Sequence, residues 1–193
     1  MVNYRKEFLL NSKLEDIQHA YFCRDKNCPV CDGFYAKLDE LFPLRPSTKS
    51  KEEKQANPGE IWRLDTPGHY PIYVLIYKDY GKFFRAVRAS EFVDFATRND
   101  YKVYGWLIEC WNTFPVLKTR LDVKIQDIDK DQLAEIINKI NMIETNGLFP
   151  VESPVKQLFQ EIELDFQNQV FLEQDEKILV EIGSDDVISY RGK

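Results

Sequence analysis

The sequence lacks any long, uninterrupted run of apolar residues. Nowhere in its 193 residues does it approach the roughly 20 consecutive apolar residues that a membrane helix needs. The first residues, MVNYRKEFLLNSK, also lack the long apolar run and the small-residue cleavage site of a signal peptide. We therefore expect a cytoplasmic protein, in which thiols stay reduced and clustered cysteines indicate metal binding or catalysis.

The chain also lacks an excess of basic residues. It has 26 Lys and Arg against 32 Asp and Glu, a formal net charge of −6. Binding to a phosphate backbone needs clustered Lys and Arg, so this balance disfavours nucleic acid as a partner. It suits a basic protein partner better.

Histidine and cysteine are scarce and gathered in one place. Of two His and four Cys, one His and three Cys stand in HAYFCRDKNCPVC, residues 19–31. His19 and Cys23 are four residues apart, so on a helix they share one face. Cys28 and Cys31 form a C-x-x-C turn. Four nitrogen and sulfur ligands are what a closed, structural zinc site needs, so the pattern predicts a zinc ion that staples two short helices.

Three other interpretations of this cluster stay open. A redox pair would normally follow a strand and open a helix, and the absence of a βαβ pattern argues against it. An iron–sulfur cluster with one His ligand and cysteines buried as small hydrophobes are the others. Because a filled Cys3His shell has no place for water, we expect no catalytic metal. Cys110, in WLIECW, is expected in the core, and His69 is given no role.

The pattern predicts an α+β chain in four parts. For residues 1–43 the pattern predicts two short helices joined by the cysteine loop. For residues 44–58, LRPSTKSKEEKQANP, it predicts a linker. Residues 59–150 predict a sheet followed by a helix. Residues 151–193 predict a further helix and an extended tail.

Strand patterns occur in GEIWRLD, PIYVLIYK, KFFRAVR, YKVYGWLIECW and RLDVKIQDI. A short helix capped by Ser90 is expected in SEFVDFATRND. A longer helix is expected in DIDKDQLAEIINKINMI, capped by Asp129 and ended by Gly147. Ser153 is expected to cap the last helix, SPVKQLFQEIELDF.

The helix-borne H-x3-C followed by a C-x-x-C turn resembles the zinc-binding anti-sigma factors. Those proteins clamp a sigma factor with a small zinc-stapled helical domain, although their usual spacing differs from the interval between Cys23 and Cys28. The two short helices also carry more apolar surface than they can bury alone. The partner contacts expected there are Tyr21, Phe22, Phe34, Tyr35, Leu38, Leu41 and Phe42. The alternative is that these side chains pack on the sheet.

Residues 59–143 are similar to the MazF/PemK toxins, through GEIW, PIYVLIYK and KIQDIDKDQLAEIINKI. The resemblance implies an SH3-like barrel. The toxins cleave RNA with an Arg after the first strand and a Thr or Ser at the end of the third. Here the first loop, DTPGHYPIY, has no Arg, and Ser90 alone matches the hydroxyl. Arg85 and Arg88 could substitute only if their strand turns them toward the groove. We therefore expect no catalytic residues and no enzyme activity; the alternative is a MazF-like endoribonuclease.

Together the two resemblances match the MazF-like anti-sigma factors of the CRISPR-associated Lon protease pathway (the CalpT family). That resemblance implies an extracytoplasmic-function sigma factor (CalpS-like) as partner. It also implies a CRISPR-associated Lon protease (CalpL-like), which a type III CRISPR signal switches on and which releases the sigma factor. The implied role is transcription regulation in antiviral defence.

Overall fold

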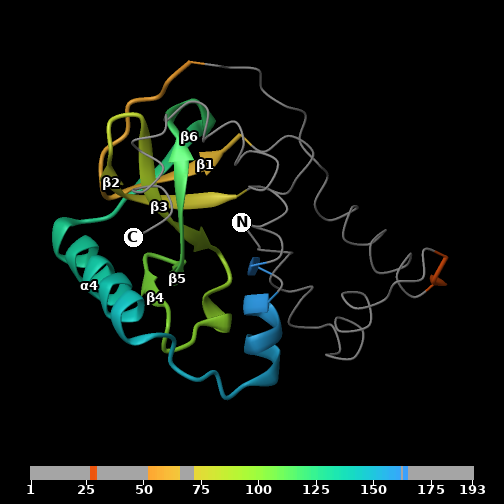
Figure 1. The fold of residues 1–193 in the computed structure, drawn as a ribbon. Helices are drawn as coiled ribbons and strands as arrows, with labels where there is room; N and C mark the ends of the chain where they lie inside the picture. Colours follow the sequence, from red (N-terminus) through yellow and green to blue (C-terminus); the bar gives the residue numbers. More distant parts are fainter. Residues whose placement is uncertain (1–26, 30–51, 66–71, 162, 165–193) are drawn as a thin grey trace.

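The computed structural model describes residues 27–29, 52–65, 72–161 and 163–164 (Figure 1). Its strands are β1 (Glu60–Leu64), β2 (Tyr73–Asp79), β3 (Phe83–Ser90), β4 (Tyr101–Val103), β5 (Trp106–Leu117) and β6 (Leu121–Asp127). Two short 3-10 helices, η1 (Val93–Phe95) and η2 (Lys118–Arg120), precede β4 and β6, and α4 (Lys130–Asn146) follows β6. A further helix, residues 154–161 and 163–164, is called the 154–164 helix below. The expected α+β class is confirmed.

The six strands form one antiparallel sheet in the order β4-β5-β3-β2-β1-β6. Side chains alternate across it, as the two-residue period of a strand requires. One face carries a single cluster that joins Trp62 of β1, Phe84 of β3, Phe114 of β5 and Leu121 of β6. For side chains from both ends of the sheet to meet, the sheet must curl around them. This agrees with the expected barrel, while membership of the MazF/PemK family stays a prediction.

α4 covers the other face of the sheet. Its Ile136, Ile140 and Ile143 pack with residues such as Leu75 and Val87 in a second buried cluster. Cys110 belongs to this cluster and is 1% exposed, which confirms its expected place in the core. Burial raises the pKa of its thiol to about 12, so the sulfur stays protonated and unreactive at neutral pH.

Both ends of α4 were predicted correctly. The Asp129 side chain accepts a hydrogen bond from the Gln132 amide at 2.9 Å, which caps the first turn. Gly147 ends the helix with φ 82°, and its N–H donates to the Ile143 carbonyl.

YKVYGWLIECW supplies strand as expected, and it does so as two strands, because Tyr104 (φ 49°) and Gly105 (φ 84°) make a tight left-handed turn between β4 and β5. The helix expected after Ser90 was predicted wrongly. The segment after Ser90 forms only η1 instead of a capped helix. Asp100 closes the end of this segment instead, since its carboxylate accepts hydrogen bonds from the amide and the hydroxyl of Thr97.

Residues on both sides of the sheet region also pack against it. Lys54 N donates to the Lys118 carbonyl at 3.2 Å, and Ala56, placed in the expected linker, lies in the core at 8% exposure. Beyond α4, Phe159 of the 154–164 helix stacks on Phe95 at 4.7 Å between ring centroids. In Figure 1 this helix and α4 lie on opposite sides of β4 and β5. Within the described ranges, no helix is long and apolar enough to cross a membrane.

Gly59 is the glycine whose replacement should harm the fold most. Gly59 (φ 97°) and Gly81 (φ 83°) both need left-handed backbone, but a Cβ at Gly59 would lie 3.1 Å from the Ile128 carbonyl oxygen, and one at Gly81 meets nothing within 4 Å. We expect Gly81→Ala to cost about 1–2 kcal/mol of unfolding free energy and Gly59→Ala about 1–3 kcal/mol more. Urea unfolding of both variants measures this, and equal losses would contradict it.

Candidate functional site

The predicted zinc site lies almost wholly outside the described residues. Of His19, Cys23, Cys28 and Cys31, the structure describes Cys28 alone, and its side chain is buried. Within the described ranges, no group of three or more His, Cys, Asp or Glu residues is placed to hold a metal ion. The predicted partner contacts, Tyr21, Phe22, Phe34, Tyr35, Leu38, Leu41 and Phe42, also lie outside the described residues. Both sets stay predictions.

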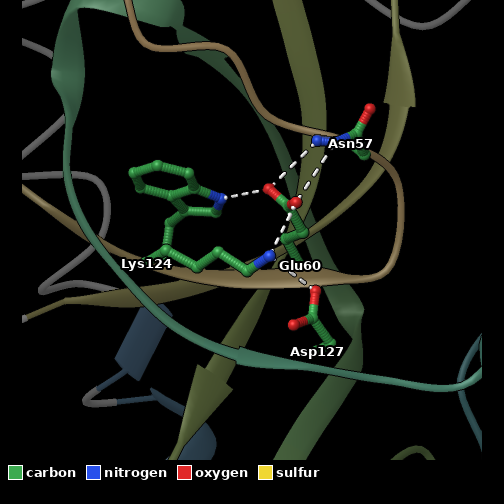
Figure 2. Close-up of polar contacts among 5 residues, drawn as sticks. Asn57, Glu60, Lys124 and Asp127 are labelled. Carbon is green, nitrogen blue, oxygen red and sulfur yellow. Dashed lines mark hydrogen bonds and ion pairs between the residues drawn. The ribbon is translucent and has the colours of Figure 1, made fainter.

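The acidic residue of the GEIW segment is held by a dense set of donors. Glu60 Oε2 accepts from Trp62 Nε1 at 2.9 Å and from Asn57 N at 3.1 Å, while Oε1 accepts from Lys124 Nζ at 2.9 Å and from Asn57 Nδ2 at 3.2 Å. Figure 2 shows the Glu60 carboxylate between Asn57 and Lys124, with Asp127 beyond the lysine. Lys124 Nζ also pairs with Asp127 at 2.7 Å. These bonds join the turn before β1 to the edge strand β6.

The donors also decide the charge of Glu60. Burial by itself opposes ionisation, but the hydrogen bonds from Lys124, Trp62 and Asn57 outweigh it and lower the pKa of Glu60 to about 2. The carboxylate is therefore ionised throughout the neutral range, and its oxygens are occupied by hydrogen bonds from Asn57, Trp62 and Lys124. We infer that this cluster stabilises the fold, because the Glu60 carboxylate carries no proton at neutral pH and both of its oxygens already accept two hydrogen bonds.

Because the folded pKa of Glu60 is depressed, its contribution to stability is present above its ordinary value of 4.5 and is lost as pH falls toward about 2. We expect Glu60→Gln to lower the unfolding free energy at pH 7 by roughly 2 kcal/mol. The difference in unfolding free energy between Glu60→Gln and the wild type should decrease steadily below pH 4.5. Thermal or urea unfolding from pH 7 to pH 3 tests this, with Glu53→Gln, an exposed carboxylate, as control. A gap independent of pH would contradict it.

On the side of the sheet opposite α4, a buried ion pair joins β3 to the 154–164 helix. Arg88 Nε donates to Glu163 Oε2 at 2.9 Å, and both side chains are 3% exposed. The same guanidinium donates through Nη1 to the carbonyls of Tyr73 at 3.1 Å and Ala89 at 2.8 Å. Burial alone would lower the pKa of Arg88, but the charges of Glu163 and Glu109 raise it, so the guanidinium stays charged.

An irregular stretch of β5 brings a second carboxyl to this pair. Val87 is opposite Thr113 and Ala89 is opposite Ile108, so residues 109–112 of β5 face the single residue Arg88. Such a bulge re-aims side chains locally. Glu109 is completely buried, and its Oε2 accepts from Asn112 Nδ2 at 2.9 Å. Burial and, next, the charge of Glu163 raise the pKa of Glu109 well above its ordinary value, with Arg88 opposing them.

Ser90, the expected match to a catalytic hydroxyl, is also buried, at the end of β3. It is 1% exposed, and its Oγ has no hydrogen-bond partner among the described residues. Its neighbour across the ladder is Leu107, which packs against Phe159 of the 154–164 helix. Arg85 has no place in this group. Its guanidinium contacts Tyr77, Thr113 and Glu144 instead.

Sequence reasoning therefore found Arg88 and Ser90 but missed Glu109 and Glu163. A weak signal existed for both. Glu109 is the single charge inside an apolar strand segment, and Glu163 stands four residues after Phe159 on the buried side of the last helix. Neither signal identifies a partner 75 residues away, which is the separation of Arg88 and Glu163.

The burial of the Arg88–Glu163 pair predicts an unequal response to single and double substitution. Arg88→Met alone leaves the buried Glu163 without its counter-charge and should cost about 3–5 kcal/mol, whereas the Arg88→Met/Glu163→Leu double variant should cost much less. The matched control is Arg63→Met, which breaks the pair with Asp122, where both side chains are 20% exposed. That variant should lose about 0–1 kcal/mol. A double variant that is no more stable than Arg88→Met in urea unfolding would contradict the prediction.

No protein-family model matches the chain, and no curated protein matches it. Among solved structures, the chain is similar to one chain of a structure described as "Endoribonuclease in complex with its cognate antitoxin from Mycobacterial species". The two are 15% identical with a TM-score of 0.38, over 50% of this chain and 100% of that one. A likeness this distant carries no argument about activity or partners.

Proposed function

We propose that the chain is a non-catalytic binding protein of the anti-sigma type. Residues 1–43 would form the zinc-stapled module that holds an extracytoplasmic-function sigma factor, and the curled sheet would serve as its platform. Release would follow proteolysis by a CRISPR-associated Lon protease in antiviral signalling. The zinc and partner steps rest on the resemblance of HAYFCRDKNCPVC and its surroundings to the anti-sigma factors.

The observation that carries the non-catalytic step is the burial of Arg88 and Ser90. Cleavage of RNA by a MazF-type site needs a cation free to face the charge that develops on the phosphate. Arg88 is 2% exposed and already donates to Glu163 and to two backbone carbonyls. Ser90 is 1% exposed. With the 154–164 helix docked, neither group can reach an RNA strand, which supports binding over cleavage.

The charge of the chain supports a protein partner over nucleic acid. The net charge is −6, and a duplex or single strand would be repelled unless basic residues gathered in one patch. A basic protein partner is attracted by the same charge, which speeds encounter. This favours the sigma-factor proposal over a zinc-ribbon nucleic-acid binder.

The test is co-expression of the full chain with an extracytoplasmic-function sigma factor, followed by co-purification and zinc analysis. We expect a stable complex, one zinc per chain, and inhibition of transcription from the sigma factor's promoter. His19→Ala and the Cys28→Ser/Cys31→Ser pair should lose both zinc and the complex. His69→Ala is the matched control, because it removes the other histidine of the chain and should keep both.

The same protein preparations test the alternative that the chain is an endoribonuclease. Purified wild-type chain should leave RNA intact in a gel assay without added metal. Cleavage that disappears in Ser90→Ala would identify an endoribonuclease and overturn the proposal. Full sigma-factor binding by the Cys28→Ser/Cys31→Ser variant would overturn the zinc-stapled clamp.

A further inference from the structure

The proposed function gives no role to the buried cluster of Arg88, Glu109 and Glu163, which has two acidic groups and one basic group. Arg88, Glu109 and Glu163 are 2%, 0% and 2% exposed. With both carboxyls ionised, the three groups would carry one net negative charge away from water. Burying an unmatched charge is costly, so the cluster favours a bound proton.

The geometry identifies Glu109 as the holder of that proton. Glu163 receives the charged Nε donor of Arg88 at 2.9 Å. Glu109 receives a hydrogen bond from the neutral amide of Asn112, and its Oε1 is buried without a hydrogen-bond partner among the described residues. Of the two carboxyls, Glu109 therefore has the weaker stabilisation of its charged form.

The charged groups on neighbouring elements do not change this balance. Asp100, in the loop before β4, adds a third buried acid near Glu109 and raises the pKa of Glu109 further. The Asp100 carboxylate is occupied by Thr97 and Trp111. Lys139 of α4 donates to the Asp100 backbone carbonyl at 2.6 Å.

We propose that Glu109 is a proton-dependent latch for the 154–164 helix. With Glu109 protonated, Arg88 is matched by Glu163 alone and the helix stays docked. When Glu109 releases its proton to water, two carboxylates face one guanidinium, and undocking of the helix carries Glu163 into solvent. Opening uncovers Arg88, Ser90 and Leu107 on β3 and β5.

The helix is the element free to move. Arg88 pairs with Val74 of β2, and Glu109 lies in the bulge of β5 between the ladder positions Ile108 and Thr113, so both belong to the sheet. The helix is held by side chains: Phe159 among aromatic rings, Lys156 Nζ to the Ala96 carbonyl at 2.6 Å, and Gln160 to Thr97 at 3.3 Å. Its Val155 and Leu164 are 37% and 46% exposed. Elements held in this way open locally before the whole fold unfolds.

The direction of the pH effect follows from the raised pKa of Glu109. Glu109 binds its proton more tightly in the docked state than in the open state, so low pH favours the docked state. As pH rises above the ordinary value of 4.5, the opening constant should increase by up to about tenfold per pH unit, until Glu109 ionises in the docked state.

Hydrogen exchange of the full chain from pH 5 to pH 9 tests the latch. The readout is the protection factor of amides 157–161, corrected for the intrinsic pH dependence of exchange, with amides of α4 as the reference for global unfolding. We expect wild-type protection in this helix to fall by up to about tenfold per pH unit while α4 stays protected. Glu109→Gln should abolish the fall, and Glu161→Gln, an exposed acid on the same helix, should behave as wild type.

Wild-type protection that does not vary with pH, or the same fall in Glu109→Gln, would overturn the latch. If Glu109→Gln fails to fold, carbon NMR titration of the wild-type Glu109 carboxyl decides the question. Titration near the ordinary value of 4.5 would overturn the latch, and a clearly higher midpoint would support it. The latch rests on described residues alone and stands or fails independently of sigma-factor binding.

Discussion

The guanidinium of Arg88 needs a counter-charge, and much of the molecule is arranged around that need. Arg88 lies in a central strand where water does not reach it, so its charge must be matched from inside the protein. The match comes from Glu163, which lies 75 residues further along the chain. This requirement ties the 154–164 helix to β3. The same helix packs through Phe159 against Leu107, the neighbour of Ser90 across the β3–β5 ladder.

A second constraint holds the opposite end of the sheet together. Gly59 N donates to the Ile76 carbonyl at 2.8 Å, and the Gly59 carbonyl accepts from Ile128 N at 2.7 Å. A Cβ at Gly59 would lie only 3.1 Å from the Ile128 carbonyl oxygen. Glu60 then links the same turn to Trp62 and to Lys124 of β6. Three of the four residues in GEIW are therefore explained by the curl of the sheet. Because these residues have structural roles, similarity in this segment indicates a similar fold and does not indicate an activity.

The two constraints divide the chain into parts with different roles. The hydrogen bonds of Glu60 to Asn57, Trp62 and Lys124 stabilise the sheet, and they occupy both oxygens of its carboxylate. The Arg88 cluster is less complete, because Glu109 and Ser90 each keep a buried oxygen without a partner among the described residues. Incomplete satisfaction of this kind marks a place where the docked state is less stable than it could be. The proposed latch concerns the 154–164 helix, whereas the proposed partner contacts lie in residues 1–43.

Short-range signals in the sequence determined the elements. The apolar run in PIYVLIYK, the Asp129 cap and the Gly147 stop were predictable because each depends on residues within about one helical turn or strand pair. The turn at Tyr104 was missed, since a tyrosine at a left-handed position carries no local signature. Tertiary structure alone decided what Arg88 does. The pairing register of β3 with β5, the bulge at Glu109 and the docking of Glu163 join residues far apart in sequence, and the energy of a buried charge depends on which of them arrive together.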